Sequence, residues 1–251
     1  MQTYKITPLI TMYMDCNEHS MFTYMQHYGD KVTAPVVIWL VQGNGHNVLV
    51  DSGSSKADIA SRYHHPSRQT PEMLPAEILR AAGVECKDID TIILTHLHWD
   101  HCYNLELFPN AEIYIQKKEL EYAVDPLPCH RFSYELGNYE LTPPWLPFLK
   151  RMCVKDGDYE LFDGIRVYHL PGHTPGMQCP VIHTTEGDYL VASDNIPLYE
   201  NWEGNEKAKH IPGTIMCNMF DYYKSLERIE TICDAVLPGH DIKVAYIGSI
   251  G

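Results

Sequence analysis

The sequence has little of what marks nucleic-acid-binding or membrane-spanning proteins. Only 19 of its 251 residues are Lys or Arg, against 33 Asp and Glu, so the formal net charge is −14. That balance repels a phosphate backbone and argues against a nucleic-acid partner. No apolar run approaches the roughly 20 residues that span a bilayer, so we expect no membrane association either.

Signals for export and for a disulfide framework are also lacking. The N-terminal stretch MQTYKITPLITMYMDCNEH has one early Lys, a short interrupted apolar run and no cleavage pattern of small residues, which argues against a signal peptide. The eight cysteines never form a Cys-x-x-Cys pair and do not crowd a short chain. We therefore expect a cytoplasmic protein whose cysteines are mostly packing residues.

What is present suits a globular enzyme. Apolar residues make up 45% of the chain and charged residues 21%, which is ordinary for a folded domain with a large core. No linker-like segment or repeat divides the sequence. We predict a single domain over residues 1–251, interrupted by a lid-like excursion at about 125–154 that carries five prolines and many aromatic residues.

Hydrophobic patterning predicts a mixture of strands and helices. The runs APVVIWLVQ and HNVLVDSG flank Gly-Asn-Gly and predict a hairpin, while PEMLPAEILRAAGV predicts a helix that ends at Gly83. DTIILT and AEIYIQ predict further strands, and two later hairpins are expected around Asp163-Gly164 and Glu186-Gly187. NMFDYYKSLERIETICD has an apolar stripe at helical spacing. The fold class is therefore α/β.

Metal-type side chains follow four of the apolar runs. Strand ends at one edge of a sheet lie close in space, so residues placed there can converge on one site. THLHWDHC carries four candidates behind Ile92-Ile93-Leu94, and the other three follow in PGHTPG, VASD and LPGH. The candidate ligands are His96, His98, Asp100, His101, His173, Asp194 and His240.

Spacing within the first motif indicates two ions rather than one. His96 and His98 lie two residues apart and can share an ion, whereas Asp100 and His101 lie further along the turn and favour a second one.

The three later residues complete this division. His173 adds to the first pair and His240 to the second, and Asp194 can offer one carboxylate oxygen to each ion. Imidazole and carboxylate ligands suit zinc best, and also iron, cobalt or manganese, so we expect two divalent cations with zinc first.

These motifs resemble those of the metallo-β-lactamase superfamily. The H-x-H-x-D-H run, PGHTPG, the Ser-Asp after a strand and the final PGH occur in order, and VLVDSG with Asp51 resembles an earlier strand-end motif of that superfamily. The resemblance extends from about Val36 to His240. It implies an αββα sandwich with the metal site along one edge of the two sheets.

Within the superfamily, the sequence is most similar to the N-acyl homoserine lactonase group, through SDNIPLYENWEG, TAPVVIWLV and the aromatic N-terminal loop. This resemblance implies a metal-dependent hydrolase that opens a lactone ring by attack of a metal-bridging hydroxide. Asp100 would pass a proton to the leaving group. Tyr199, five positions after Asp194, would donate a hydrogen bond to the substrate carbonyl. A homodimer is also implied.

Two alternatives stay open. A glyoxalase II-like thioesterase would need basic side chains for the carboxylates of a glutathione thioester, but the stretch from Phe220 onward has no basic cluster. A non-catalytic metal-binding or redox module of the same fold would bind metal without turnover. The predicted mouth of the site is instead aromatic and apolar, which suits a neutral small molecule. Its predicted lining is Phe22, Tyr24, Met25, Tyr28, Trp145, Phe148, Tyr199 and Trp202.

The other polar candidates receive structural interpretations. Asp51 is expected to accept hydrogen bonds from turn amides or from a ligand histidine. Cys102 is expected to pack in the wall of the site rather than bind metal. The histidines outside the motifs are interpreted as structural or surface residues: His19, His27, His46, His64, His65, His130, His169, His183 and His210.

Overall fold

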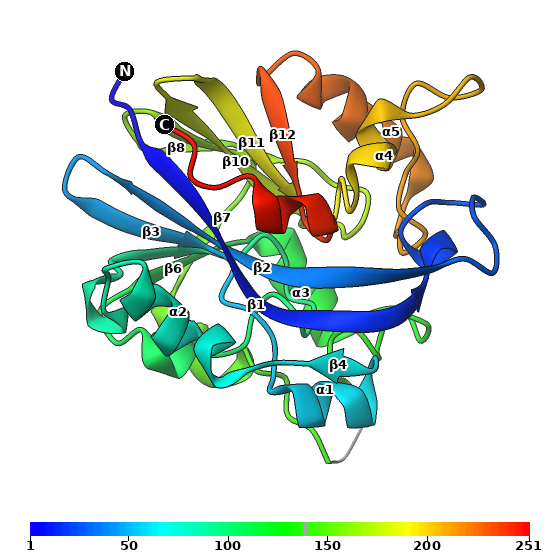
Figure 1. Cartoon of the computed structure of the whole chain (residues 1–251), viewed down its shortest axis with the longest axis horizontal. Helices are drawn as coiled ribbons and strands as arrows, with labels where there is room; N and C mark the ends of the chain where they lie inside the picture. The colour runs from blue at the N-terminus through cyan, green and yellow to red at the C-terminus, as the bar shows by residue number, and fades with distance from the viewer. Residues whose placement is uncertain (138–139) are drawn as a thin grey trace.

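The computed structural model describes residues 1–137 and 140–251, which form two stacked β-sheets with helices on their outer faces (Figure 1). The larger sheet has the strand order β4-β1-β2-β3-β5-β6-β7, and the smaller sheet has the order β12-β11-β10-β9-β8. The larger sheet comprises β1 (Lys5–Glu18), β2 (Lys31–Gly43), β3 (His46–Val50), β4 (Ser67–Arg68), β5 (Thr91–Ile93), β6 (Glu112–Gln116) and β7 (Met152–Lys155). The smaller comprises β8 (Tyr159–Phe162), β9 (Ile165–His169), β10 (Gln178–Thr184), β11 (Gly187–Ser193) and β12 (Ala235–Pro238).

Strand β2 shows why the sheets stack. It is buried on both faces, because Leu40 packs on the outer side of the larger sheet and Trp39 packs against the smaller sheet. Successive side chains of a strand point to opposite faces, so an uninterrupted apolar run suits a central strand. The predicted hairpin to β3 is confirmed, with Asn44 and Gly45 at positive φ in its turn.

Helices cover the outer face of each sheet. Leu79 of α2 and Ala123 of α3 belong to the same buried cluster as Leu40, on the outer side of the larger sheet. Leu226 of α5 packs with Leu190 of β11 on the outer side of the smaller sheet. The helices are α1 (Ala57–Tyr63), α2 (Pro75–Ala81), α3 (Lys117–Val124), α4 (Tyr199–Glu203) and α5 (Met219–Ile229). The predicted αββα sandwich is therefore confirmed.

Two regions differ from the sequence-based expectation. The N-terminal stretch forms the long strand β1, which pairs with β2 and which the interrupted apolar pattern did not reveal. The excursion at 125–154 ends in regular structure, because a 3₁₀ helix (Leu146–Arg151) leads into β7 at the edge of the larger sheet. Its residues 138–139 lie outside the described part of the chain.

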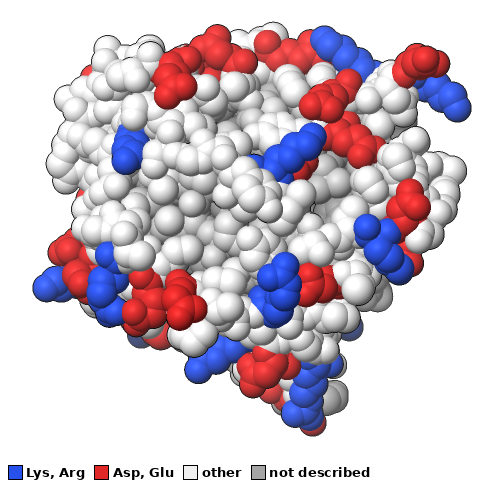
Figure 2. Space-filling view, in the orientation of Figure 1, with Lys and Arg blue, Asp and Glu red and all other residues white. Residues whose placement is uncertain are grey.

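The described helices and the visible surface are consistent with the composition. None of the helices in residues 1–137 and 140–251 has the length and apolarity to cross a bilayer. On the face shown in Figure 2, Lys and Arg side chains are scattered among acidic and uncharged ones and do not gather into a basic patch.

Candidate metal centre

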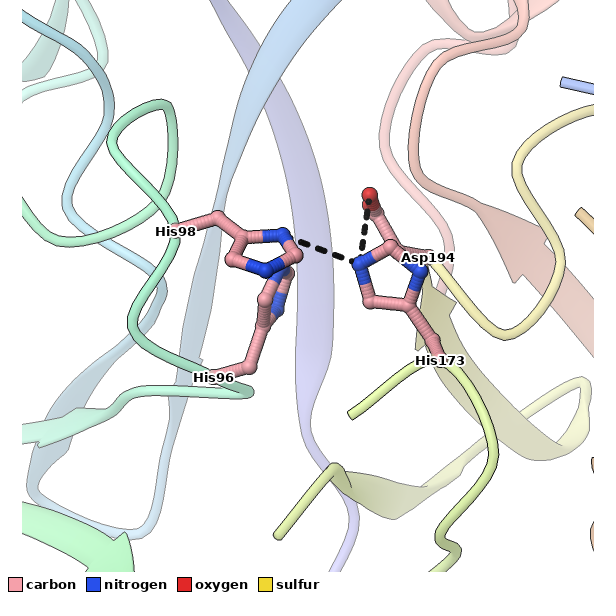
Figure 3. A group of neighbouring side chains, drawn as sticks. All are labelled: His96, His98, His173 and Asp194. Atoms are coloured by element: carbon pink, nitrogen blue, oxygen red, sulfur yellow. Dashed lines mark hydrogen bonds and ion pairs between the residues drawn. The ribbon is translucent and has the colours of Figure 1, made fainter. Parts of the chain in front are cut away.

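Four chain segments that are distant in sequence bring the seven predicted ligands together. The loop after β5 carries the first four, the loop between β9 and β10 carries His173, Asp194 directly follows β11, and His240 lies two residues after β12. These strands belong to both sheets, so the ligands meet where the two sheets end at one rim. They form two buried groups: His96, His98, His173 and Asp194 in one (Figure 3), and Asp100, His101 and His240 in the other.

Asp194 lies between the two groups. Its Oδ2 is 3.4 Å from Nε2 of His173 in the first group. Its Oδ1 is 3.2 Å from Nε2 of His101 and 3.0 Å from Nε2 of His240 in the second. Each carboxylate oxygen thus faces a different set of imidazoles. The glycine before His240 permits this approach, because a Cβ on Gly239 would lie 3.0 Å from Oδ1 of Asp194.

The remaining distances within each group are equally short. Oδ2 of Asp100 lies 3.6 Å from Nε2 of His101 and 3.6 Å from Nε2 of His240. Nδ1 of His98 lies 3.0 Å from Nε2 of His173 (Figure 3). Two ring nitrogens at that distance repel each other through their lone pairs unless a proton or a cation lies between them.

Hydrogen bonds at the outer nitrogen fix the orientation of four imidazoles. When Nδ1 donates to an oxygen, the ring keeps an Nε2 lone pair that can bind a metal. Nε2 of His96 and of His101 is buried and has no hydrogen-bond partner in the described part of the chain. The Nδ1 distances are 3.0 Å from His96 to Oγ1 of Thr95, 2.8 Å from His101 to Oδ2 of Asp51, 2.9 Å from His173 to O of Ile215 and 2.9 Å from His240 to O of Pro35.

The donor set therefore fits divalent metal ions. Oriented lone pairs on buried imidazoles, next to carboxylates, are the ligands that zinc and similar cations take in proteins. Without a cation, the buried Nε2 of His96 would bear a desolvation cost that no hydrogen bond in the described part of the chain offsets.

The electrostatics differ between the two groups. Burial lowers the pKa of His96 and His98, which keeps both imidazoles neutral. Burial also opposes protonation of His101, but the charges of Asp100 and Asp194 outweigh it and raise the pKa of His101. In turn, burial alone would raise the pKa of Asp194, yet His240 and His101 hold it well below its usual range. Without a bound cation, the carboxylates therefore favour positive charge on His101, which is the charge that a divalent cation would supply in its place.

Asp51 supports both the first motif and a ligand. Its carboxylate accepts hydrogen bonds from the backbone N of Thr95 at 2.7 Å and from Nδ1 of His101 at 2.8 Å. The residue has a φ of 61°, a left-handed conformation that Asp tolerates better than most residues. The predicted hydrogen bonds of Asp51 to a turn amide and to a candidate ligand histidine are confirmed.

A cleft opens over the metal-binding groups. Its floor is formed by the ligand candidates His98, Asp100, His173, Asp194 and His240. Its walls come from β1, the loop after it, the loop after α1, the first motif, the excursion and the loops before α4 and α5. The wall residues are Met14, Asn17, Met21, Phe22, His65, Trp99, Phe132, Ser133, Pro197, Gly213 and Ile215. No Lys or Arg from the described part of the chain is among them.

Sequence comparison identifies the family. The family model described as the metallo-beta-lactamase superfamily matches residues 33–240 of this chain. The chain belongs to the metallo-β-lactamase superfamily. The ordered motifs predicted this membership, and the match covers every candidate ligand from His96 to His240.

Several relatives of this chain are named N-acyl homoserine lactonase. An N-acyl homoserine lactonase from Bacillus sp is 28% identical over 243 residues, which are 90% of this chain and 89% of that protein. Another, from Bacillus thuringiensis, is 29% identical over 196 residues, or 74% of each chain. An N-acyl homoserine lactone hydrolase, solved with the product N-hexanoyl-L-homoserine at its catalytic metal centre, superposes with a TM-score of 0.79 at 25% identity. That superposition covers 97% of this chain and 95% of the other.

Tyr199, the second predicted catalytic residue, does not line the cleft of this superfamily member. It begins α4, where its backbone N donates to Oδ2 of Asp241 at 2.9 Å. Its ring packs near Lys243, whose Nζ lies 5.7 Å from the ring centroid. Pro197, three residues after Asp194, forms the wall at this point instead. The structure thus unites the seven ligand candidates but leaves Tyr199 outside them.

The predicted aromatic mouth is largely wrong. Of the residues expected there, Phe22 lines the cleft, and Trp99 and Phe132 supply the other aromatic walls. Trp145 is buried in the core beside α3 because the excursion folds back onto the larger sheet. Tyr28 is exposed on the loop before β2.

The excursion is fastened to the first motif by a buried network. Glu135 accepts a hydrogen bond from the hydroxyl of Tyr103 at 2.7 Å, and its other oxygen lies 2.9 Å from Nε2 of His64. The ring of His64 stacks on Trp99 at 4.0 Å between centroids. Because Trp99 lies between two ligand candidates in sequence, this packing holds the motif against Phe132 and the rest of the excursion.

Glu119 is a supporting residue that the sequence did not reveal. It is fully buried in α3, and its carboxylate accepts hydrogen bonds from the backbone N of Leu97, the hydroxyl of Tyr134 and the hydroxyl of Thr174. Leu97 and Thr174 each adjoin a candidate ligand. One carboxylate therefore connects the two loops of the first group. A Cβ on Gly176 would lie 2.1 Å from the backbone N of Glu119, so only glycine fits there.

Proposed function

We propose that this chain is a binuclear metal-dependent hydrolase that opens the ring of N-acyl homoserine lactones or related lactones. The observation that carries the proposal is the position of Asp194, whose two carboxylate oxygens face two separate groups of ligand candidates. The relatives named N-acyl homoserine lactonase support the substrate class. Zinc is the expected metal at both positions.

The described residues would hold and serve this chemistry in distinct ways. His96, His98 and His173 would hold one cation and Asp100, His101 and His240 the other, with Asp194 shared between them. Two such cations, when bound, would lower the pKa of water to supply a nucleophile near neutral pH and would polarise the lactone carbonyl.

Ring opening consumes one water. The acyl carbon gains the water oxygen, the ring C–O bond breaks, and the released alkoxide needs a proton. The carboxylate of Asp100 lies at the floor of the cleft and would take a proton from the attacking water and pass it to the alkoxide oxygen. The apolar walls, including Phe22 and Trp99, would bind the acyl chain and keep bulk water away.

The charge of the cleft favours a lactone over a glutathione thioester. A glutathione thioester brings two carboxylates, which need basic partners when they leave water. The described cleft wall offers no Lys or Arg as such a partner. A neutral lactone with an apolar tail needs none.

Specificity constants on one metal-quantified preparation test the proposal. The panel comprises N-hexanoyl- and N-decanoyl-L-homoserine lactone, simple γ- and δ-lactones, and S-lactoylglutathione. We expect kcat/KM for the acyl homoserine lactones to exceed that for the thioester by at least about a hundredfold, or about 2.7 kcal/mol in transition-state binding. A thioester preference would assign the chain to the glyoxalase II-like branch. Stoichiometric metal without turnover of any substrate would leave a metal-binding module.

A further inference from the structure

One side chain in the cleft wall has a buried polar atom without a partner. Asn17 is 3% exposed and lines the cleft that ends at His98 and Asp194. Its Nδ2 donates to the backbone O of Met14 at 2.9 Å. Its Oδ1 has no hydrogen-bond partner in residues 1–137 and 140–251, and no other cleft-wall side chain has such a buried unpartnered atom.

The hydrogen bond to Met14 fixes which end of the amide is free. An Asn side chain has a donor end and an acceptor end, and the backbone O of Met14 can only accept. The Nδ2 group therefore belongs at Met14, and the carbonyl oxygen is the atom left for a ligand. The free group is thus the hydrogen-bond acceptor Oδ1, and a ligand that pairs with it needs an N–H or O–H donor.

A β-bulge in β1 turns Asn17 toward the cleft. Met14 pairs with Ala34 and Asn17 with Val32, so Asp15 and Cys16 together oppose the single residue between those partners on β2. Cys16 has a φ of 57°, a left-handed conformation that is uncommon for a residue other than glycine.

Without the bulge, the alternation of the strand would place a different side chain inside. Met12 and Met14 are both buried, so strict alternation would bury Cys16 next and expose Asn17. The extra residue reverses this order, and Cys16 is exposed while Asn17 is buried. Bulges often re-aim a side chain next to an active site. The bulge therefore places one amide side chain in a wall that is otherwise mostly apolar.

The substrate proposed above has one donor that a plain lactone lacks. In an N-acyl homoserine lactone, an amide N–H joins the acyl chain to the ring, and an alkyl lactone carries no N–H there. We propose that Oδ1 of Asn17 accepts a hydrogen bond from this amide N–H and so selects acylamino lactones over plain ones. The inference rests on the proposed lactonase function and adds the recognition of the amide to it.

A double comparison of substrate and variant isolates this hydrogen bond. The substrates are N-hexanoyl-L-homoserine lactone and its N-methyl amide analogue, in which a methyl group replaces the donor hydrogen; the added bulk is the same for every variant and cancels in the comparison. The variants are Asn17→Leu, which removes the acceptor at similar volume, and Asn17→Asp, which keeps a carboxylate oxygen as acceptor. Metal content and melting temperature are measured for each protein, so that a folding defect is seen separately.

For each protein, the preference is kcat/KM for the N–H substrate divided by kcat/KM for the N-methyl analogue. We expect this preference to be about tenfold larger in the wild type than in Asn17→Leu. The loss should lie mainly in KM, because the amide N–H is not altered by ring opening. Asn17→Asp should keep a preference for the N–H substrate.

An equal loss on both substrates in Asn17→Leu would overturn the inference and leave Asn17 a structural residue of β1. An unchanged ratio would overturn it as well. If the wild type opens neither lactone, the proposed function itself fails, which the wild-type measurements alone reveal. The two failures are therefore distinguishable.

Discussion

The hydroxyl of Thr174 donates a hydrogen bond of 2.6 Å to Oε2 of Glu119, although the two residues lie 55 positions apart. The other carboxylate oxygen accepts from the backbone N of Leu97 at 3.0 Å. Thr174 follows His173, and Leu97 precedes His98. This buried carboxylate therefore connects two loops that carry candidate ligands of the first group.

Replacing Glu119 by Gln should change how stability depends on pH. Burial raises the pKa of Glu119 above its ordinary value of 4.5, against the opposing hydrogen bonds from Thr174 and Tyr134. The folded state then keeps the proton longer than the unfolded state, so the free energy of unfolding falls as pH rises above 4.5 through the folded pKa. Glu119→Gln lacks this contribution to the slope.

Urea unfolding of metal-free protein, from about pH 4.5 to 8, measures the effect. The stability of the wild type relative to Glu119→Gln should decline as pH rises. Glu121→Gln is the matched control, because Glu121 lies on the same helix but is exposed, with only a 3.8 Å pair to Lys117. A constant difference between wild type and Glu119→Gln would show that Glu119 titrates alike in both states.

Removing one histidine from each group should empty the two metal positions separately. We expect two equivalents of metal in the loaded wild type, because the seven ligands fall into two groups. His240→Ala should lose the ion of the second group and keep the first, whereas His96→Ala should lose the first. Elemental analysis of dialysed protein measures this, with His183→Ala, a histidine paired with Asp188 far from the centre, as the control. A single equivalent in the loaded wild type contradicts the binuclear proposal.

Asp194→Asn should reduce turnover far more than it perturbs the fold. A neutral amide has nearly the same volume but cannot bridge two cations as a carboxylate does. We expect kcat to fall by at least about a hundredfold, which is the range for removing one electrostatic stabiliser. The rise in melting temperature on adding metal should also shrink relative to wild type, because ligand binding stabilises the folded state in proportion to affinity. Wild-type turnover and metal content in the variant would exclude the bridge.

Tyr199→Phe tests whether the tyrosine predicted from sequence reaches the substrate. A hydrogen bond to the developing oxyanion would make the variant slower by about tenfold or more. The position of Tyr199 beside Asp241 and Lys243 predicts a change in kcat below about twofold instead. Steady-state kinetics on protein of verified metal content decides between these outcomes.

Strand-end motifs made the metal centre predictable. A buried strand such as Thr91–Ile93 has a strong apolar signature, and a ligand placed directly behind it inherits a known position at the rim of the sheet. His96, Asp194 and His240 all follow this rule, so their convergence could be inferred before any coordinates. The hairpin of β2 and β3 was predictable for the same reason, because its turn residues carry a local signal.

The cleft wall was not predictable, because its residues depend on backbone details without a sequence signature. The bulge that buries Asn17 depends on the positive φ of Cys16. Cysteine is not a residue type that predicts a left-handed backbone conformation. His65 had a structural interpretation, yet it lines the cleft because α1 ends beside Trp99. Trp145 was expected at the mouth of the site but is buried in the core. An aromatic residue in an irregular segment can occupy either place, and the sequence does not distinguish them.

The division of the chain between the two sheets determines when the site can be built during synthesis. The larger sheet is complete by Lys155, and four of the ligand candidates emerge with it, but His173, Asp194 and His240 belong to the part translated afterwards. A nascent chain that folds its first sheet would therefore still lack half of the ligands of each proposed metal site, with Asp194 counted in both. The complete ligand sets would form only after the second sheet has folded against the first. Tight metal binding would therefore indicate that both halves of the sandwich are assembled.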